Sequence, residues 1–370
     1  MKKKLLIVVQ HIRRGGIEIT AINLVKNLNP EKYDITFYLV NPYNSRQDEQ
    51  LMQELMHRNV RFICRPKAEK SYPQKYRHLL KIMQEGGYDI VHSHVMFYSG
   101  MVMKAAKKAG VPKRVAHSHE IRWNREENLR FKLYKAFMRR WINCNATDVI
   151  ACCKQAGIYL CGNSAYRSKG KFLPNGIDTD TYAYNLDARI KKRRELSISD
   201  HERLVGHIGT IYYIKNQVFL TDIFAEMLKI DPNLKLLLAG EEVERDAVEQ
   251  KAEKLGVKNK IIFAGQRSDI PELLQAMDIM IFPSLFEALP VALIEAQAAK
   301  LPCLISDTIT SEVQLNSNLE FMSLQDDAKA WAEKAMELMQ CEREQIQTAD
   351  LRAQYDIKNT IRQLERIYES

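Results

Sequence analysis

Short apolar runs rich in β-branched residues alternate with amphipathic helical patterns along nearly the whole chain. This alternation predicts strand–helix–strand units, and therefore parallel sheets covered by helices. In the first half the expected strands are residues 5–9, 34–40, 60–64, 90–92, 114–117, 148–152 and 171–173. In the second half they are residues 203–208, 234–239, 261–263, 279–282 and 304–306. The sequence therefore predicts an α/β protein with two doubly wound, Rossmann-like domains.

The 370 residues suffice for two such domains, and the pattern breaks at Pro174-Asn175-Gly176. We expect a first domain over residues 1–178, joined by a C-terminal helix at 352–370, and a second over residues 179–351. The polar stretch Lys191-Lys192-Arg193-Arg194 is expected to face solvent in the connection between them. Two domains of this kind bind a ligand in the cleft between them, at the carboxyl ends of their strands.

The charge is divided unevenly between the two halves. Residues 1–180 carry 32 Lys and Arg against 15 Asp and Glu, whereas residues 181–370 carry 23 against 31. A basic first half indicates an anionic partner there: nucleic acid, a membrane surface or a phosphorylated acceptor. Nucleic acid is disfavoured because no recognisable nucleic-acid module is present.

Several features predict a cytoplasmic protein. No apolar run approaches the roughly 18–20 residues that a membrane span needs. Only five apolar residues follow the N-terminal lysines, which is too few for a signal peptide. The seven cysteines form no CxxC pair and no complete disulfide framework, as expected in a reducing compartment.

The segment 283–296 carries the most chemical information. A buried strand ends at Phe282, and a helix is expected to begin near Pro290. The free N–H groups of its first turn would suit a phosphate. Glu287 and Glu295 flank that turn, where sugar hydroxyls would give them charge-assisted hydrogen bonds. Two solvent-facing glutamates would produce the same spacing, so the spacing alone leaves both interpretations open.

This segment resembles the E-x7-E signature of retaining glycosyltransferases of family four, which have the GT-B fold. Other segments match that family in the same order along almost the whole chain. They are Gly15-Gly16-Ile17-Glu18, residues 89–94, residues 115–119, Pro174-Asn175-Gly176-Ile177-Asp178, Lys215-Asn216, residues 265–271 and Ala276-Met277-Asp278. The most similar subgroup comprises bacterial enzymes of exopolysaccharide or capsule synthesis.

The resemblance implies a role for each matched residue of the second domain. Glu295 would bind the ribose hydroxyls of a nucleotide, which the resemblance implies is UDP, and Glu287 would bind the hydroxyls of the donor sugar. Lys215 would stabilise the leaving diphosphate. The backbone N–H groups of Leu289 and Val291 would add to this, whereas Pro290 has none to donate.

In the first domain, the resemblance implies that Gly15 and Gly16 allow a loop to approach the diphosphate. His119, at a strand end, would contact the donor sugar near its anomeric carbon. From the residues alone, a half-buried histidine bonded to a backbone carbonyl is the simpler interpretation of His119.

Three positions depart from the family pattern. Thr210 stands where the family usually has an arginine that joins the lysine on the diphosphate. Ala288 and Lys300 stand where glycine is usual. Losing one of two cations at the leaving group would cost about 1.5–3 kcal/mol, unless Arg267 or Arg14 replaces it. A slower enzyme, a compensated enzyme and a subunit without catalysis remain open.

The basic excess is concentrated between Arg122 and Trp141. Its mixture of aromatic, apolar and basic residues is typical of an interfacial helix. A soluble helix that packs Phe131, Tyr134, Phe137, Met138 and Trp141 into the core would look similar. The implied acceptors are polyprenyl-diphosphate sugars, which would place the protein at the inner face of the cell membrane.

The sequence thus predicts a hexosyltransferase that moves a sugar from a nucleotide donor to a lipid-linked glycan, without cofactor or metal. The alternatives are a non-catalytic or weakened partner subunit that binds nucleotide sugar, and a GT-B sugar-nucleotide epimerase, which would not need a membrane-facing helix. His92 with His94, and His117 with His119, superficially suggest a metal site. Strand-end packing and sugar contacts are preferred, because nothing marks further ligands.

Overall fold

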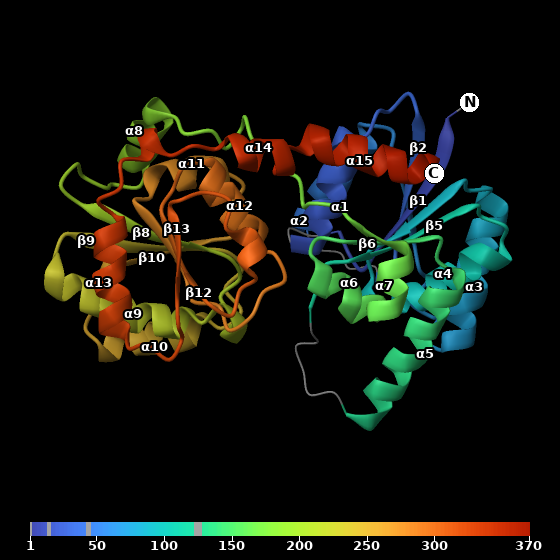
Figure 1. Ribbon diagram of the computed structural model, residues 1–370, viewed down its shortest axis with the longest axis horizontal. Coiled ribbons are helices and arrows are strands. Elements are labelled where there is room, and N and C mark those ends of the chain that lie inside the picture. The colour runs from blue at the N-terminus through green and yellow to red at the C-terminus, as the bar shows by residue number, and fades with distance from the viewer. Residues whose placement is uncertain (1, 13–15, 42–45, 122–127) are drawn as a thin grey trace. The chain divides into compact units, whose positions relative to one another are not determined.

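The computed structural model describes residues 2–12, 16–41, 46–121 and 128–370 (Figure 1). It divides the chain into two compact units, Met1–Gly176 with Ile357–Ser370, and Ile177–Asp356. The sequence placed these divisions at residues 178 and 351.

The N-terminal unit contains a parallel sheet with the strand order β3-β2-β1-β4-β5-β6-β7. The strands are β1 (Lys3–Val9), β2 (Tyr33–Leu39), β3 (Arg61–Cys64), β4 (Ile90–Ser93), β5 (Lys113–Ser118), β6 (Asp148–Ala151) and β7 (Gly170–Phe172). Its α-helices are α1 (Gly16–Asn27), α2 (Arg46–Met56), α3 (Tyr72–Gly86), α4 (Ser99–Lys108), α5 (Leu129–Asn145), α6 (Lys154–Cys161), α7 (Asn163–Lys169) and α15 (Ile357–Glu369).

The central strand β1 explains why this sheet is covered on both faces. Successive side chains of a strand point to opposite faces. Leu5, Ile7 and Val9 accordingly pack into one apolar core with residues of α1 and α15. Leu6 and Val8 pack into a second core with residues of α3, α4 and α5. A strand buried on both faces reads as a continuous apolar run, as the sequence of β1 does.

The C-terminal unit contains a second parallel sheet with the order β10-β9-β8-β11-β12-β13. The strands are β8 (Arg203–Ile208), β9 (Leu234–Ala239), β10 (Ile261–Gly265), β11 (Ile279–Phe282), β12 (Cys303–Ser306) and β13 (Leu319–Met322). Its α-helices are α8 (Leu186–Glu195), α9 (Gln217–Ile230), α10 (Arg245–Lys254), α11 (Ile270–Ala276), α12 (Val291–Ala298), α13 (Ala328–Leu338) and α14 (Ala349–Tyr355). The expected pair of Rossmann-like sheets is therefore confirmed.

Two sequence expectations for this unit need correction. Strand β13 was not expected, because its four residues include Glu320 and only Leu319 is fully buried. The stretch at 191–194 is not a solvent-facing connection, because it forms part of α8, and Lys192 and Arg193 are each only 7% exposed. Arg193 pairs with Asp278 at 3.2 Å, which brings α8 against the start of β11.

The last helix, α15, returns to the N-terminal unit. Its apolar face buries Ile357, Ile361, Leu364 and Tyr368 in the core that also contains α1. The phenol of Tyr368 then reaches the N-terminal sheet, where it bonds with His92 of β4.

Candidate functional site

In the C-terminal unit, the two loops that carry the predicted donor-binding residues lie together. Lys215 ends a short 3₁₀ helix, η2 (Tyr213–Lys215), that follows β8, and Glu287 lies in the loop after β11. The Lys215 ammonium forms an ion pair with the Glu287 carboxylate, and it also lies 4.9 Å from the ring centroid of Phe282. The structure therefore joins two of the three residues predicted to be catalytic.

Backbone and side-chain bonds hold these two loops in place. The Asn216 side-chain amide donates to the Pro283 carbonyl at 3.1 Å, and the Leu285 N–H donates to the Ile214 carbonyl at 2.8 Å. Asn216 adopts a left-handed conformation with φ 57°, which asparagine tolerates better than most residues. The turn at Asn216 connects the 3₁₀ helix that ends at Lys215 to the start of α9.

A close approach of two backbones fixes the loop that begins at Gly209. Gly240, after β9, has φ 156°, and a Cβ there would lie 2.1 Å from the Gly209 carbonyl oxygen. The Gly209 N–H donates to the Ala239 carbonyl at 2.8 Å. Only glycine fits at residue 240, so the end of β9 supports the loop that carries Thr210.

Helix α12 carries Glu295, whose surroundings differ from those of Glu287. The Tyr182 hydroxyl donates to the Glu295 carboxylate at 2.7 Å. Burial raises the pKa of Glu295 to about 6, and the bond from Tyr182 opposes that rise. Burial and the neighbouring Glu295 together raise the pKa of Tyr182, which therefore stays protonated. Sequence reasoning missed Tyr182; its place just after the Pro174-Asn175-Gly176 segment was the only available signal.

The residues just before α12 are buried. Ala288 and Leu289 are buried, and Val291 begins the helix directly after Pro290. The first N–H groups of any α-helix lack partners within the helix. This geometry is compatible with the predicted phosphate contact of Val291.

Of the two candidates for a compensating cation, the described part of the chain includes only Arg267, and its guanidinium is already paired. Arg267 makes two bonds to the Asp269 carboxylate, at 2.7 and 2.6 Å, and Lys192 shares that carboxylate at 2.9 Å. Arg14 lies outside the described residues. Thr210 accepts a bond from the Gln217 side chain through its backbone carbonyl at 2.9 Å.

His207 is a buried histidine that sequence reasoning did not single out. Its Nδ1 donates to the Ile281 carbonyl at 3.0 Å, so its Nε2 is an unprotonated acceptor. Burial lowers its pKa to about 4, and the nearby Lys215 contributes to that shift. Its ring stacks on Phe282 with 4.8 Å between centroids. The Phe282 ring thus contacts both His207 and Lys215.

In the N-terminal unit, the predicted site residues lie where β1 and β5 end. Gly16 is the first residue of α1, and a Cβ there would meet no described atom within 4 Å. Gly15 lies outside the described residues. His119 follows β5, and its Nε2 bonds with Nδ1 of His94 at 2.9 Å. The partner of His119 is thus a second imidazole and not a backbone carbonyl.

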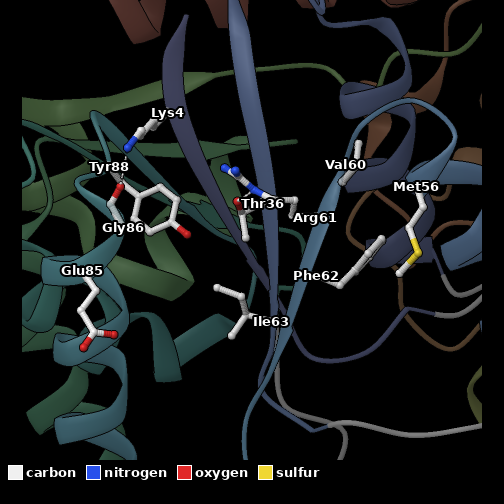
Figure 2. Close-up of a pocket in the computed structure, with 10 residues that line it drawn as sticks. All are labelled: Lys4, Thr36, Met56, Val60, Arg61, Phe62, Ile63, Glu85, Gly86 and Tyr88. Carbon is white, nitrogen blue, oxygen red and sulfur yellow. Dashed lines mark hydrogen bonds between the residues drawn. The ribbon is translucent and has the colours of Figure 1, made fainter.

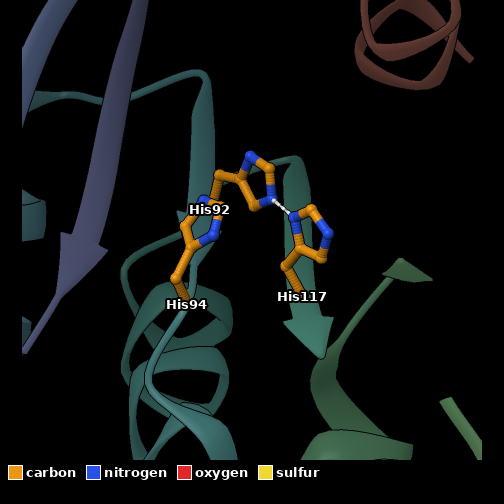
Figure 3. A group of neighbouring side chains, drawn as sticks. All are labelled: His92, His94 and His117. Carbon is orange, nitrogen blue, oxygen red and sulfur yellow. Dashed lines mark hydrogen bonds between the residues drawn. The ribbon is translucent and has the colours of Figure 1, made fainter. Parts of the chain in front are cut away.

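His119 belongs to a cluster of four imidazoles, three of which Figure 3 shows. His92 Nε2 bonds with His117 Nδ1 at 3.1 Å, and the ring pairs 92–94 and 117–119 have centroids 4.2 and 4.1 Å apart. Burial lowers the pKa of His92 and of His119 to about 3, and holds the pKa of His94 and His117 well below its ordinary value. All four rings are therefore neutral at physiological pH.

Glu120, the residue after His119, was also missed. Burial raises its pKa to about 7, and the neighbouring Glu18 of α1 adds to the rise. A carboxyl group that titrates near neutrality at a sheet edge is typical of a functional site. Its only sequence signal was its position beside the matched segment 115–119.

A separate groove of about 620 Å³ opens in the N-terminal unit (Figure 2). Its lining includes Lys4 near the start of β1, Arg61 at the start of β3, and the end of α3. Lys4 donates to the Gly86 carbonyl at 3.0 Å. The groove therefore lies toward the amino ends of the strands, away from the predicted site residues.

The sequence left two interpretations open for segment 122–141, and helix α5 has one face that fits each of them. Phe131, Tyr134, Met138 and Trp141 pack against the core beside α4. Leu129, Leu133 and Phe137 instead form a stripe that is 72%, 64% and 51% exposed. Residues 122–127 lie outside the described residues. Among the described helices, none is long and apolar enough to cross a membrane.

Both halves of the chain match known protein families. Residues 14–181 match the domain family described as Glycosyltransferase Family 4, and residues 188–356 match Glycosyl transferases group 1. The putative glycosyltransferase EpsF of Bacillus subtilis is 32% identical over 374 residues, which cover 99% of this chain and 96% of that protein. The chain therefore belongs to the family 4 glycosyltransferases, as the sequence resemblance indicated.

The chain is also similar to two further proteins. The UDP-Gal:alpha-D-GlcNAc-diphosphoundecaprenol alpha-1,3-galactosyltransferase of Escherichia coli is 24% identical over 303 residues, covering 79% of this chain and 76% of that enzyme. The crystal structure of Anabaena HepE in complex with UDP and glucose superposes with a TM-score of 0.80 at 19% identity, over the full length of both chains. The fold is thus GT-B.

Proposed function

We propose that this protein transfers a hexosyl unit from a UDP-sugar to a lipid-linked glycan in exopolysaccharide or capsule synthesis, with retention at the anomeric carbon and without a metal ion. The ion pair between Lys215 and Glu287 carries the proposal. It places a cation and a hydroxyl acceptor in two adjoining loops at the carboxyl edge of the second sheet, where doubly wound folds bind nucleotides.

Each group has one task in this proposal. Lys215 and the first N–H groups of α12 offset the charge that grows on the leaving diphosphate, so a metal is not needed there. Glu295 holds the ribose, and Glu287 and His119 hold the sugar. The leaving diphosphate takes the proton of the acceptor hydroxyl as that oxygen attacks the same face of the anomeric carbon.

The acceptor and the membrane are proposed from α5 and from the polyprenyl-linked acceptor of the galactosyltransferase relative. Basic side chains at Arg130, Lys132 and Arg140 flank the exposed stripe of Leu129, Leu133 and Phe137. Apolar side chains bordered by cations suit an anionic lipid surface. The protein would therefore work as a peripheral protein at the inner face of the cell membrane.

Turnover of a panel of UDP-hexoses with an undecaprenyl-diphosphate-linked acceptor tests this proposal. We expect transfer from at least one donor in the presence of a chelator, and NMR of the product should show the donor's anomeric configuration. Release of an epimerised sugar without any acceptor would instead identify an epimerase.

A second candidate is a subunit that binds nucleotide sugar with weak or no catalysis. Thr210 supplies no charge, and Arg267 is already engaged by Asp269. Binding of UDP without transfer to any acceptor, and activation of a partner transferase, would favour this candidate.

A further inference from the structure

Two neighbouring strands of the N-terminal sheet each end in a His-x-His sequence. His92 and His94 lie at the end of β4, and His117 and His119 at the end of β5, which pairs with β4 in parallel. Side chains two residues apart on a strand point to the same face. Four imidazoles therefore gather at one edge of the sheet, and Figure 3 shows that His92, His94 and His117 face one another.

The spacing of these rings matches the requirements of a metal ion. One nitrogen from each of His92, His94 and His117 lies within 4.8 Å of the others. Zinc–nitrogen bonds of about 2.0–2.1 Å place two nitrogens of a tetrahedral ion roughly 3.3 Å apart. The His92 Nε2 to His117 Nδ1 distance is 3.1 Å. The two nitrogens can share one ion once the proton of their hydrogen bond leaves the pair and both lone pairs turn toward the metal.

Unsatisfied ring nitrogens provide an independent indication of a ligand. Within the described part of the chain, His94 Nε2, His117 Nε2 and His119 Nδ1 are buried and have no hydrogen-bond partner. A buried polar atom without a partner costs about 1–3 kcal/mol. Of these nitrogens, His94 Nε2 belongs to the three-histidine set, and a metal ion coordinated there would remove that part of the cost.

Tyr368 provides the outer contact that metal-binding histidines usually have. The hydroxyl of Tyr368 lies 2.7 Å from His92 Nδ1. When His92 donates its Nδ1–H to this hydroxyl, its Nε2 lone pair is directed at His117. A hydrogen bond of this kind fixes the tautomer and the orientation of a ligating imidazole.

We propose that His92, His94 and His117 bind a divalent transition metal of the zinc class. An all-imidazole set suits zinc, copper or nickel, whereas magnesium and calcium prefer oxygen ligands. This ion would be separate from the transfer chemistry. Because the ion would engage His94, which bonds to His119, it would lower sugar transfer, and this last consequence rests on the proposed function.

Metal binding is tested on the full chain after chelator treatment and dialysis. Titration with cobalt(II) should give the visible absorption of a tetrahedral ion, saturating at one equivalent per chain. His92→Gln and His117→Gln should each lose this signal. His207→Gln, which removes a buried histidine of the other unit, is the matched control and should retain it. No cobalt or zinc binding at micromolar free metal would overturn the proposal.

X-ray absorption of the zinc-loaded wild-type protein provides a second test that does not depend on variants folding. The expected first shell contains nitrogen, with the outer scattering of imidazole. Sulfur in that shell would place the ion on the exposed cysteines Cys64, Cys144 or Cys341 and would contradict the proposal. A zinc-loaded protein that transfers sugar as fast as the metal-free form would contradict only the inhibitory consequence.

Discussion

The hydroxyl of Tyr182 donates a 2.7 Å hydrogen bond to the carboxylate of Glu295. Both groups belong to the C-terminal unit, 113 residues apart in the sequence. Glu295 is thereby held in one orientation before any ligand binds. A carboxylate that is already oriented loses less side-chain entropy when it accepts hydroxyl groups from a ribose.

The first prediction concerns the pH dependence of UDP affinity. The ionised form of Glu295 is the better hydroxyl acceptor, and its pKa is raised to about 6. Affinity should therefore be constant well above pH 6 and fall as the pH decreases through about 6. In Tyr182→Phe the bond that lowers this pKa is lost, so the midpoint should move to higher pH.

Calorimetric titration with UDP between pH 5 and 8, roughly one unit either side of that midpoint and beyond, measures this effect. Tyr184→Phe, which removes a nearby hydroxyl without touching Glu295, is the control and should keep the wild-type midpoint. An unchanged midpoint in Tyr182→Phe would mean that Glu295 does not govern nucleotide binding.

The second prediction concerns Thr210. If diphosphate binds beside Lys215, Thr210→Arg adds a charged, bidentate donor where a neutral hydroxyl now stands. We expect kcat to rise about tenfold or more, with a smaller change in UDP affinity, because the charge grows in the transition state. Thr210→Val, which adds no charge, should not show the gain. A decrease in the arginine variant would indicate that another cation already occupies that space.

The third prediction concerns Arg193 in α8. Its guanidinium pairs with Asp278 and donates to the backbone carbonyls of Ala276 and Ser199. Arg193→Ala removes these bonds from a buried site, while Arg189 still donates to Asp278 and to the Ala276 carbonyl, so it should lower the free energy of unfolding by about 1–3 kcal/mol. Arg194→Ala changes the adjacent, exposed arginine and should cost less than about 0.5 kcal/mol. Equal losses in urea denaturation would contradict the buried network.

The fourth prediction concerns the exposed stripe of α5. Leu133→Ser with Phe137→Ser should abolish binding to vesicles that contain anionic lipid, and wild-type binding should fall steeply with salt. Arg139 is unsuitable for this test, because it donates to the Leu160 and Tyr159 carbonyls and so supports the fold. Leu186→Ser, at an exposed leucine of the other unit, is the control. No binding of wild type to these vesicles would exclude an interfacial role, and salt-independent binding would contradict the contribution of the basic side chains.

The sequence predicted the sheets well because their strands are buried on both faces and therefore read as apolar runs, as in Leu5 to Val9. It missed β13 because Glu320 interrupts a strand of only four residues. It misjudged Lys192 and Arg193, whose charges suggest solvent, because their partners Asp269 and Asp278 lie more than 70 residues away.

In the candidate site, too, local patterns were predicted correctly, whereas contacts between distant segments were missed. The family motif located Lys215, Glu287 and Glu295, and the structure joins the first two. No local pattern could assign Tyr182 to Glu295 or His94 to His119, because these pairs form only when distant segments fold together. The sequence singled out His94 and His119, but it did not indicate that their rings bond to each other.

The central claim is that the loop and helix carrying Glu287 and Glu295 form the donor site. Calorimetric titration of UDP into wild type, Glu295→Ala and Glu287→Ala tests it most directly. We predict that Glu295→Ala weakens UDP binding about tenfold or more, whereas Glu287→Ala leaves it nearly unchanged while reducing sugar transfer. Equal UDP affinity in all three proteins would contradict the claim and place the donor site elsewhere.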